Sequence, residues 1–272
     1  MSTECVELPR TVVRSTIRHT DPVPYDVRSL ARAEREEFAE LLAGLSPAQW
    51  QSPTLCGEWT VRDVAAHTIA YLGQSLPRLV LNMTVCRGDV DKLNARALEA
   101  LSDVDPARLV ALMRDSQPCG AGALYGGRVA LIECVVHQQD VRRPLGLTRT
   151  IPTDALRTSL TYARVSPVIG GARRTRGMRL VATDVDWAGG RGAEIRGSGE
   201  ALLLAMTGRI AAVADELSGE GVARLQPERR NRRYGRNPLP GPTIASASRA
   251  AVPVFRCAVA RRGGVRGWPP AS

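Results

Sequence analysis

The sequence has 272 residues, of which 44% are hydrophobic, and its formal net charge at pH 7 is +10. This length and composition suffice for one large core or two ordinary ones, which excludes a wholly disordered protein. The charge is unevenly placed: residues 227–272 carry ten arginines and one acidic residue, which leaves about +1 for the rest. A nearly neutral body lacks the basic surface that binds nucleic acid, so no nucleic-acid partner is expected for it.

The two ends of the chain differ from its body. Residues 1–26 are interpreted as a flexible leader, and residues 227–272, rich in Arg, Pro, Gly and Ser, as a disordered basic tail. A basic interaction arm and a shifted reading frame are alternative interpretations of the tail. No run of eighteen apolar residues occurs and the N-terminus is charged, so we expect a cytoplasmic protein without membrane contact. Six cysteines without a CxxC pair indicate reduced, mostly structural thiols.

The first predicted elements of the body are helices. Residues 27–43 place apolar side chains at helical spacing among charges, and SPAQW after them begins a turn or a short helix. Thr60 and Asp63 form a capping signature, which predicts a helix from the next residue until Pro77 bends or ends it. His67 lies in the second turn of this helix, at a core-facing offset.

Further helices are predicted along the next part of the chain. The spacing of apolar side chains predicts helices over residues 90–101 and 106–113. A Gly-rich connector follows, without the Lys-Ser/Thr of a phosphate-binding loop. It leads to a last long helix over residues 128–143, which we expect to end before Pro144 and Gly146.

This last helix carries a carboxylate and an imidazole at a notable spacing. Glu133 and His137 are four residues apart, so their side chains lie on one face. His67 is the only other histidine outside the leader. Two imidazoles and one carboxylate, with coordination positions left open, are typical of a catalytic zinc site, and Asp140 is placed to orient the ring of His137. A helical Glu-x-x-x-His pair is also common in cores and on surfaces, so spacing alone leaves a structural role open.

Two motifs resemble a known family. PTLCGEWTVRDVAAHT, residues 53–68, followed by ECVVHQQDVRRPLG, residues 133–146, resembles the mycothiol-dependent maleylpyruvate isomerase family, which is similar to DinB-like metal-binding bundles. Residues 178–225 continue the resemblance. It implies mycothiol as the thiol cofactor and a divalent metal, usually Zn²⁺. The metal ligands of the family correspond in this sequence to His67, Glu133 and His137.

The same resemblance implies an α+β fold. Residues 27–148 would form a DinB-like four-helix bundle, and residues 149–226 a small α/β domain that resembles sterol-carrier folds. In the second domain, VATDVDW and AEIRG are compatible with two strands around a turn at residues 188–192, and EALLLAMTGRIAAV with a packing helix. Arg209, in the TGR motif that closes this helix, corresponds to a substrate-facing catalytic arginine of the family. A surface arginine is the alternative interpretation.

The chemistry expected from the family depends on the metal. Coordination to Zn²⁺ deprotonates a thiol, whose ordinary pKa is about 8.5, and the thiolate attacks a small-molecule electrophile. The expected activity is cis-trans isomerisation of the maleylpyruvate type or S-transfer from mycothiol, and a metal-dependent hydrolase is also open. The alternative is a non-catalytic binding or regulatory module, with a structural or absent metal and a basic tail that contacts the partner.

Overall fold

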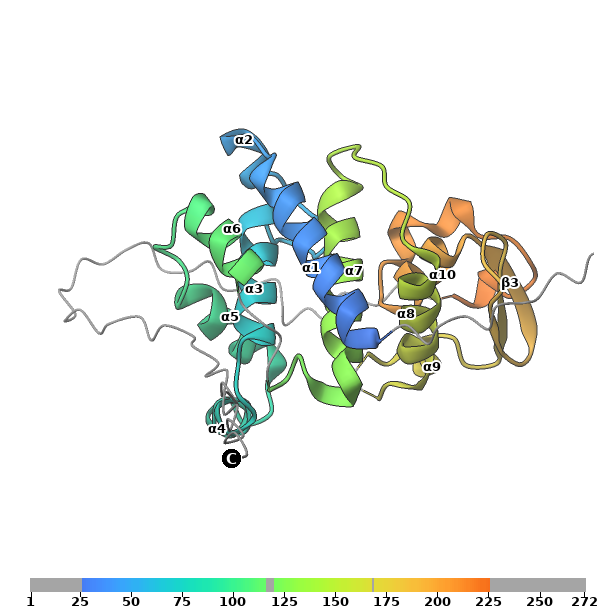
Figure 1. Ribbon diagram of the computed structural model, residues 1–272. Helices are drawn as coiled ribbons and strands as arrows, with labels where there is room; N and C mark the ends of the chain where they lie inside the picture. Colours follow the sequence, from blue (N-terminus) through green and yellow to red (C-terminus); the bar gives the residue numbers. More distant parts are fainter. Residues whose placement is uncertain (1–25, 116–119, 168, 226–272) are drawn as a thin grey trace, which may run out of the picture.

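A computed structural model describes residues 26–115, 120–167 and 169–225 (Figure 1). Helices dominate the first part of the chain, and a small three-stranded sheet with its own helices follows. The fold class is therefore α+β, as predicted. The predicted flexible leader and the predicted basic tail lie outside the described residues.

Four helices pack around a common core in the first part of the chain. They are α1 (Val27–Ala43), α3 (Val61–Leu72), α6 (Pro106–Asp115) and α7 (Arg128–Arg142). Helix α1 contacts α6 and α7, and α3 contacts the same two helices, so the four close into a ring. Phe38 of α1 and Leu109 of α6 are fully buried inside it. This arrangement is the predicted helical bundle, and the predicted bounds of α1 are confirmed.

Three further helices flank this bundle, namely α2 (Pro47–Trp50), α4 (Leu76–Val85) and α5 (Val90–Glu99). The sequence predicts that the helix beginning after Thr60 continues to Pro77. This prediction is wrong, because α3 ends at Leu72 and Gly73 follows it. Pro77 stands instead in the first turn of α4, after Ser75. Proline is tolerated there because the first helical N–H groups have no partner within the helix. The predicted capping box of α3, between Thr60 and Asp63, is confirmed.

The second part of the chain holds a sheet between helices. Its elements are α8 (Thr153–Val165), the single turn α9 (Gly171–Arg174), β1 (Met178–Ala182), β2 (Ala188–Gly190), β3 (Ala193–Gly197) and α10 (Gly199–Met206). Strand β1 is central, antiparallel to β2 and parallel to β3. The predicted turn at residues 188–192 is therefore wrong in part, since it contains β2. The sequence AGG of β2 has no alternation of apolar and polar side chains, so its pairing with β1 leaves no periodic signal.

Helix α10 is shorter than predicted and ends at Met206. Gly208 adopts φ +96°, a left-handed conformation that favours glycine. The backbone N–H of the next residue, Arg209, donates back to the carbonyl of Leu204 at 2.8 Å, which closes the helix end. The chain therefore turns sharply at Gly208, and Arg209 follows the helix instead of lying within it.

One apolar core connects the two parts of the chain. Helix α7 contacts α1 and α3 in the bundle and α8 in the second part. Its Val135 belongs to the same cluster as Leu160 of α8, Ile195 of β3 and Leu203 of α10, each at most 1% exposed. Nearly every residue of α7 is buried, polar ones included, so the helix is covered on all sides. Helix α7 therefore serves both predicted domains, whose boundary at residue 148 stays a prediction.

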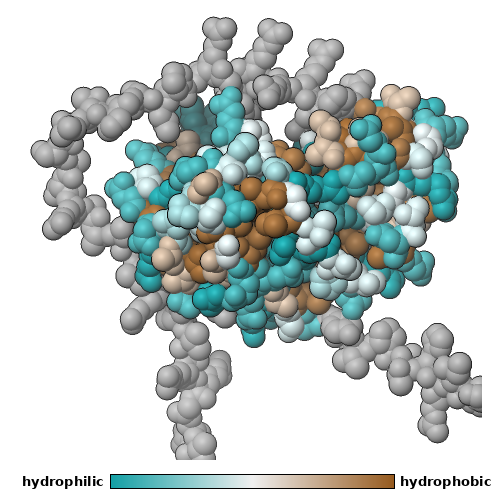
Figure 2. All heavy atoms as spheres, turned by 90° about the horizontal axis from the view of Figure 1, so that it is seen from above, coloured by the Kyte–Doolittle hydropathy of each residue, from teal (hydrophilic) through white to brown (hydrophobic). Residues whose placement is uncertain are grey.

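On the face shown in Figure 2, most of the coloured residues are hydrophilic and the hydrophobic ones gather in a few areas. Helix α4 has no buried residue and exposes 65% of Val80. Within the described ranges, none of the helices has both the length and the apolar character needed to cross a bilayer.

Candidate functional site

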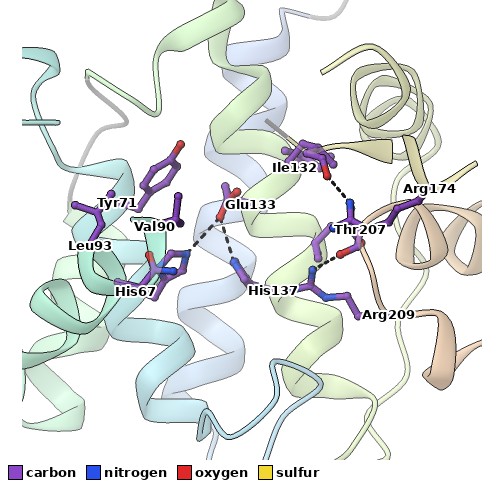
Figure 3. Close-up of a pocket in the computed structure, with 13 residues that line it drawn as sticks. His67, Tyr71, Val90, Leu93, Ile132, Glu133, His137, Arg174, Thr207 and Arg209 are labelled. Atoms are coloured by element: carbon purple, nitrogen blue, oxygen red, sulfur yellow. Dashed lines mark hydrogen bonds and ion pairs between the residues drawn. The ribbon is translucent and has the colours of Figure 1, made fainter. Parts of the chain in front are cut away.

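The three predicted ligand side chains meet between α3 and α7. Nε2 of His137 lies 3.1 Å from Oε2 of Glu133, and Nε2 of His67 lies 3.7 Å from the same oxygen. Both rings are turned toward the Glu133 carboxylate (Figure 3). One potential ligand atom from each residue lies within 4.8 Å of the other two. The structure thus brings two helices together so that three donor atoms converge on one point.

The electrostatics of this group favour positive charge between the side chains. Burial alone would raise the pKa of Glu133, but the contacts with His137 and His67 outweigh burial and hold its pKa well below the usual range. Burial lowers the pKa of His67, so its ring is neutral at neutral pH. Burial alone would also lower the pKa of His137. Its partners Asp140, Cys56 and Glu133 outweigh burial and raise this pKa well above the usual value. A carboxylate and imidazole nitrogens in such a field fit a divalent cation.

The far side of the His137 ring is held by a buried carboxylate. Nδ1 of His137 lies 2.8 Å from Oδ2 of Asp140, whose side chain is completely buried. The Nδ1–H of His137 donates to this carboxylate, so that when the ring is neutral its proton stays on Nδ1 and Nε2 is the nitrogen open to a metal. Nδ1 of His67 is also buried, but among the described residues it has no hydrogen-bond partner. The tautomer is thus fixed at His137 and left free at His67.

Arg209 reaches this buried carboxylate from the second part of the chain. Its Nε donates to Oδ1 of Asp140 at 2.9 Å and its Nη2 to Oδ2 at 2.7 Å. Arg209 also donates through Nη1 to the carbonyl of Thr207, at 2.6 Å, and through Nη2 to Sγ of Cys56, at 3.2 Å. Burial alone would raise the pKa of Asp140, but the Arg209 charge and its other partners hold it well below the usual range. Four of the five guanidinium N–H donors are thereby engaged, and one remains on Nη1.

A second group of potential metal ligands shares His137. Sγ of Cys56, Nδ1 of His137 and a carboxylate oxygen of Asp140 also lie within 4.8 Å of one another. The guanidinium of Arg209 already contacts both Cys56 and Asp140, so a cation occupies this side of the ring. A metal ion there would lie beside a fixed positive charge, which disfavours binding. The group of His67, Glu133 and His137 is therefore the better candidate for a metal site.

A pocket of about 270 Å³ opens beside the three converging side chains. Tyr71, one turn after His67, stacks on its ring at 5.9 Å between centroids, and burial raises the pKa of Tyr71 to about 12. Figure 3 shows Tyr71 on one side of Glu133 and Arg209 on the other. Tyr71 is not among the site residues predicted from the sequence, although its i, i+4 spacing from His67 places both on one helix face. No pattern in the sequence indicated that Cys56 would contact Asp140.

A family comparison bears on the first half of this site. Residues 31–79 match the family model described as the mycothiol maleylpyruvate isomerase N-terminal domain. The predicted resemblance to this family is confirmed over these residues. The matched segment contains His67, whereas Glu133 and His137 lie outside the segment.

Two solved crystal structures are also similar to the chain. One is the structure of a mycothiol-dependent maleylpyruvate isomerase, with a TM-score of 0.43 and 18% sequence identity. The other is of a mutant of a mycothiol-dependent maleylpyruvate isomerase, with a TM-score of 0.46 and 17% identity. Each alignment covers 71% of this chain and 91% of the other. Among curated proteins, none matches the sequence significantly.

Proposed function

We propose that the protein is a metal-dependent enzyme that uses mycothiol as its thiol cofactor. The reaction is a cis-trans isomerisation of the maleylpyruvate type or an S-transfer to a small electrophile. The observation that carries this proposal is the convergence of His67, Glu133 and His137 beside a pocket. The family match over residues 31–79 supports mycothiol as the cofactor. A cytoplasmic location is part of the proposal, because a low-molecular-weight thiol of this kind is found inside the cell.

The three converging side chains would hold the metal. Zn²⁺ is the expected ion, because two imidazoles and one carboxylate with open positions are a usual catalytic donor set for it. When bound, such an ion lowers the pKa of a thiol so that the thiolate is present near neutral pH. Glu133 contributes one negative charge to the site, and Asp140 holds His137 with its Nε2 toward Glu133. The chain thereby supplies both the ligands and their orientation.

Two donors of the pocket wall would act on the electrophile. The phenol of Tyr71 stays protonated at neutral pH, since its pKa is about 12. Arg209 retains one N–H on Nη1 after its four bonds within the protein. When a sulfur–carbon bond forms, negative charge moves onto an oxygen of the electrophile, and fixed donors stabilise such charge. In S-transfer the new bond is kept, whereas in isomerisation it breaks again after rotation about the former double bond.

The proposal is tested by metal content and thiol titration on the purified protein. We expect close to one zinc per chain by mass spectrometry, retained in the control Glu99→Gln and lost in Glu133→Gln. Glu99 is an exposed glutamate at the end of α5 and receives the same chemical change. With zinc-loaded protein in excess, the absorbance of mycothiol thiolate should appear at a pH well below its value in buffer. Absence of stoichiometric zinc after zinc is added back, or an unchanged thiol titration, would refute the proposal.

A further inference from the structure

The pocket beside the candidate metal site has two ends of opposite character. Figure 3 shows Val90 and Leu93 with Tyr71 on one side of Glu133, and Arg209 with Thr207 on the other. The first end is built by α3 and α5 of the bundle, and the second by the segment after α10. A ligand that reaches the three converging side chains therefore touches an apolar surface in one direction and polar groups in the other.

The apolar end is lined by Val90 and Leu93 of α5. Leu93 is buried, with 7% of its surface exposed, whereas Val90 at the start of the same helix is 53% exposed. Ile132 of α7 also lines the pocket, but on the side of Glu133 that faces Arg174 (Figure 3). A wall of this kind removes apolar ligand surface from water, a gain that scales with the area covered. A carboxylate placed against it would lose hydration without a partner there.

Both guanidinium groups that line the pocket lie at its polar end (Figure 3). The charge of Arg209 is balanced by the buried Asp140 carboxylate at 2.7 Å, and one of its N–H groups is left for a ligand. Arg174 lines the same end, and its Nη1 donates to the carbonyls of Ile169 and Met206. Among the described residues, no arginine or lysine lines the opposite end, so a second carboxylate on a short ligand would lie against the apolar side chains without a partner. One anionic group can be held at the polar end.

We propose that the pocket takes an electrophile with an apolar body and a single carboxylate, in preference to a small dicarboxylate. The apolar body lies against Val90 and Leu93, and the carboxylate faces Arg209 and Arg174. This inference rests on the proposed function for the reaction and narrows its substrate, so that maleylpyruvate itself, a dicarboxylate, is not the preferred electrophile. Its evidence is the division of the pocket walls. Val90 acts as a specificity-determining residue, since it is accessible and has no role in holding the metal.

The test measures binding of two unreactive probes to the zinc-loaded protein by calorimetry. The probes are 4-phenylbutanoate, with an apolar ring and one carboxylate, and hexanedioate, with two carboxylates on a short chain. We expect 4-phenylbutanoate to bind about tenfold more tightly, because a buried aryl group contributes a large apolar area. Val90→Asn should weaken 4-phenylbutanoate about three- to tenfold and hexanedioate less than twofold. Val165→Asn is the matched control, an exposed valine of α8 outside the pocket wall, and should change neither.

Three results would overturn the inference. They are tighter binding of hexanedioate, no binding of either probe, and equal effects of Val90→Asn and Val165→Asn. Titrating the two probes into Glu133→Gln, the variant expected to lose zinc, shows whether the preference between them depends on the metal. This separates the inference from the proposed function. A preference for 4-phenylbutanoate that persists in a wild-type protein without stoichiometric zinc would refute the proposed function alone. Zinc binding and a thiolate shift together with a preference for hexanedioate would refute the inference alone.

Discussion

The two edges of the His137 ring face different environments. At Nε2 lie the Glu133 carboxylate and the ring of His67, beside an open pocket. At Nδ1 lie the buried Asp140 carboxylate and the Cys56 thiol, and the guanidinium of Arg209 contacts both. A carboxylate lies beside the imidazole at each edge. The Nδ1 side already contains a protein cation, whereas the Nε2 side offers lone pairs toward a cavity.

This difference shows how similar residue types take different roles. Two groups of side chains each place three potential ligand atoms within 4.8 Å of one another. One consists of Cys56, His137 and Asp140, and the other of His67, Glu133 and His137. The placement of one arginine decides between the two groups. Its charge satisfies Asp140, and Asp140 in turn orients the ring toward the pocket. We call the Nε2 side the open side and the Nδ1 side the closed side.

The largest expected effect concerns the stability of the closed side. Arg209→Met leaves the Asp140 carboxylate buried without its guanidinium partner, and breaking a buried pair in this way costs about 3–5 kcal/mol. The free energy of unfolding, measured with urea, should fall by this amount. Arg191→Met, at an exposed position, is the control and should change it by less than about 0.5 kcal/mol. Equal stability of the two variants would show that the closed side does not depend on the arginine.

The next effect concerns the open side. His67→Ala removes one of the three converging donors and touches no residue of the closed side. Metal affinity, measured by competition with a chelator, should fall by more than about 100-fold, since even indirect supports of metal ligands are worth 10- to 100-fold. An affinity within threefold of wild type would remove His67 from the ligand set and leave the open side without its third donor.

A smaller effect is expected where the two sides are coupled. Asp140→Asn keeps the shape of the side chain but removes the charge that holds Nδ1 of His137. We expect metal affinity to fall about 10- to 100-fold, because this carboxylate orients the ligand. Asp186→Asn, an exposed aspartate after β1, is the matched control and should leave the affinity unchanged. If both variants bind metal like wild type, the orientation of His137 does not depend on Asp140.

The smallest effect is expected at the thiol of the closed side. Cys56→Ser preserves a hydrogen-bonding side chain next to Asp140 and Arg209. Metal affinity should change by less than about threefold. The hydrogen bonds of a thiol are weak, and the ion pair between Asp140 and Arg209 remains in this variant. A loss of more than 100-fold in this variant would mean that the sulfur is a ligand and that the two sides have been assigned the wrong way round.

Local patterns in the sequence were sufficient for the elements that carry the site. The apolar spacing of residues 27–43 and the capping signature at Thr60 depend on neighbours within one or two turns, and the structure has both. The i, i+4 spacing of Glu133 and His137 likewise follows from helix geometry alone. These features could be predicted because each is set by a few consecutive residues.

Contacts between distant segments could not be predicted in the same way. The approach of His67 to Glu133 depends on how α3 packs against α7, which the period of neither helix determines. The bond between Arg209 and Asp140 joins residues 69 positions apart and depends on the turn at Gly208. The sequence therefore indicated the candidate ligands and Arg209, but not the contact between Arg209 and Asp140.

The central claim, that a metal binds at the open side, is tested most directly by X-ray absorption at the zinc edge. The sample is the zinc-loaded protein without added thiol. We expect a first shell of nitrogen and oxygen at about 2.0–2.2 Å, with imidazole scattering from two rings and no sulfur. A sulfur neighbour at about 2.3 Å that disappears in Cys56→Ser would place the metal on the closed side and contradict the account.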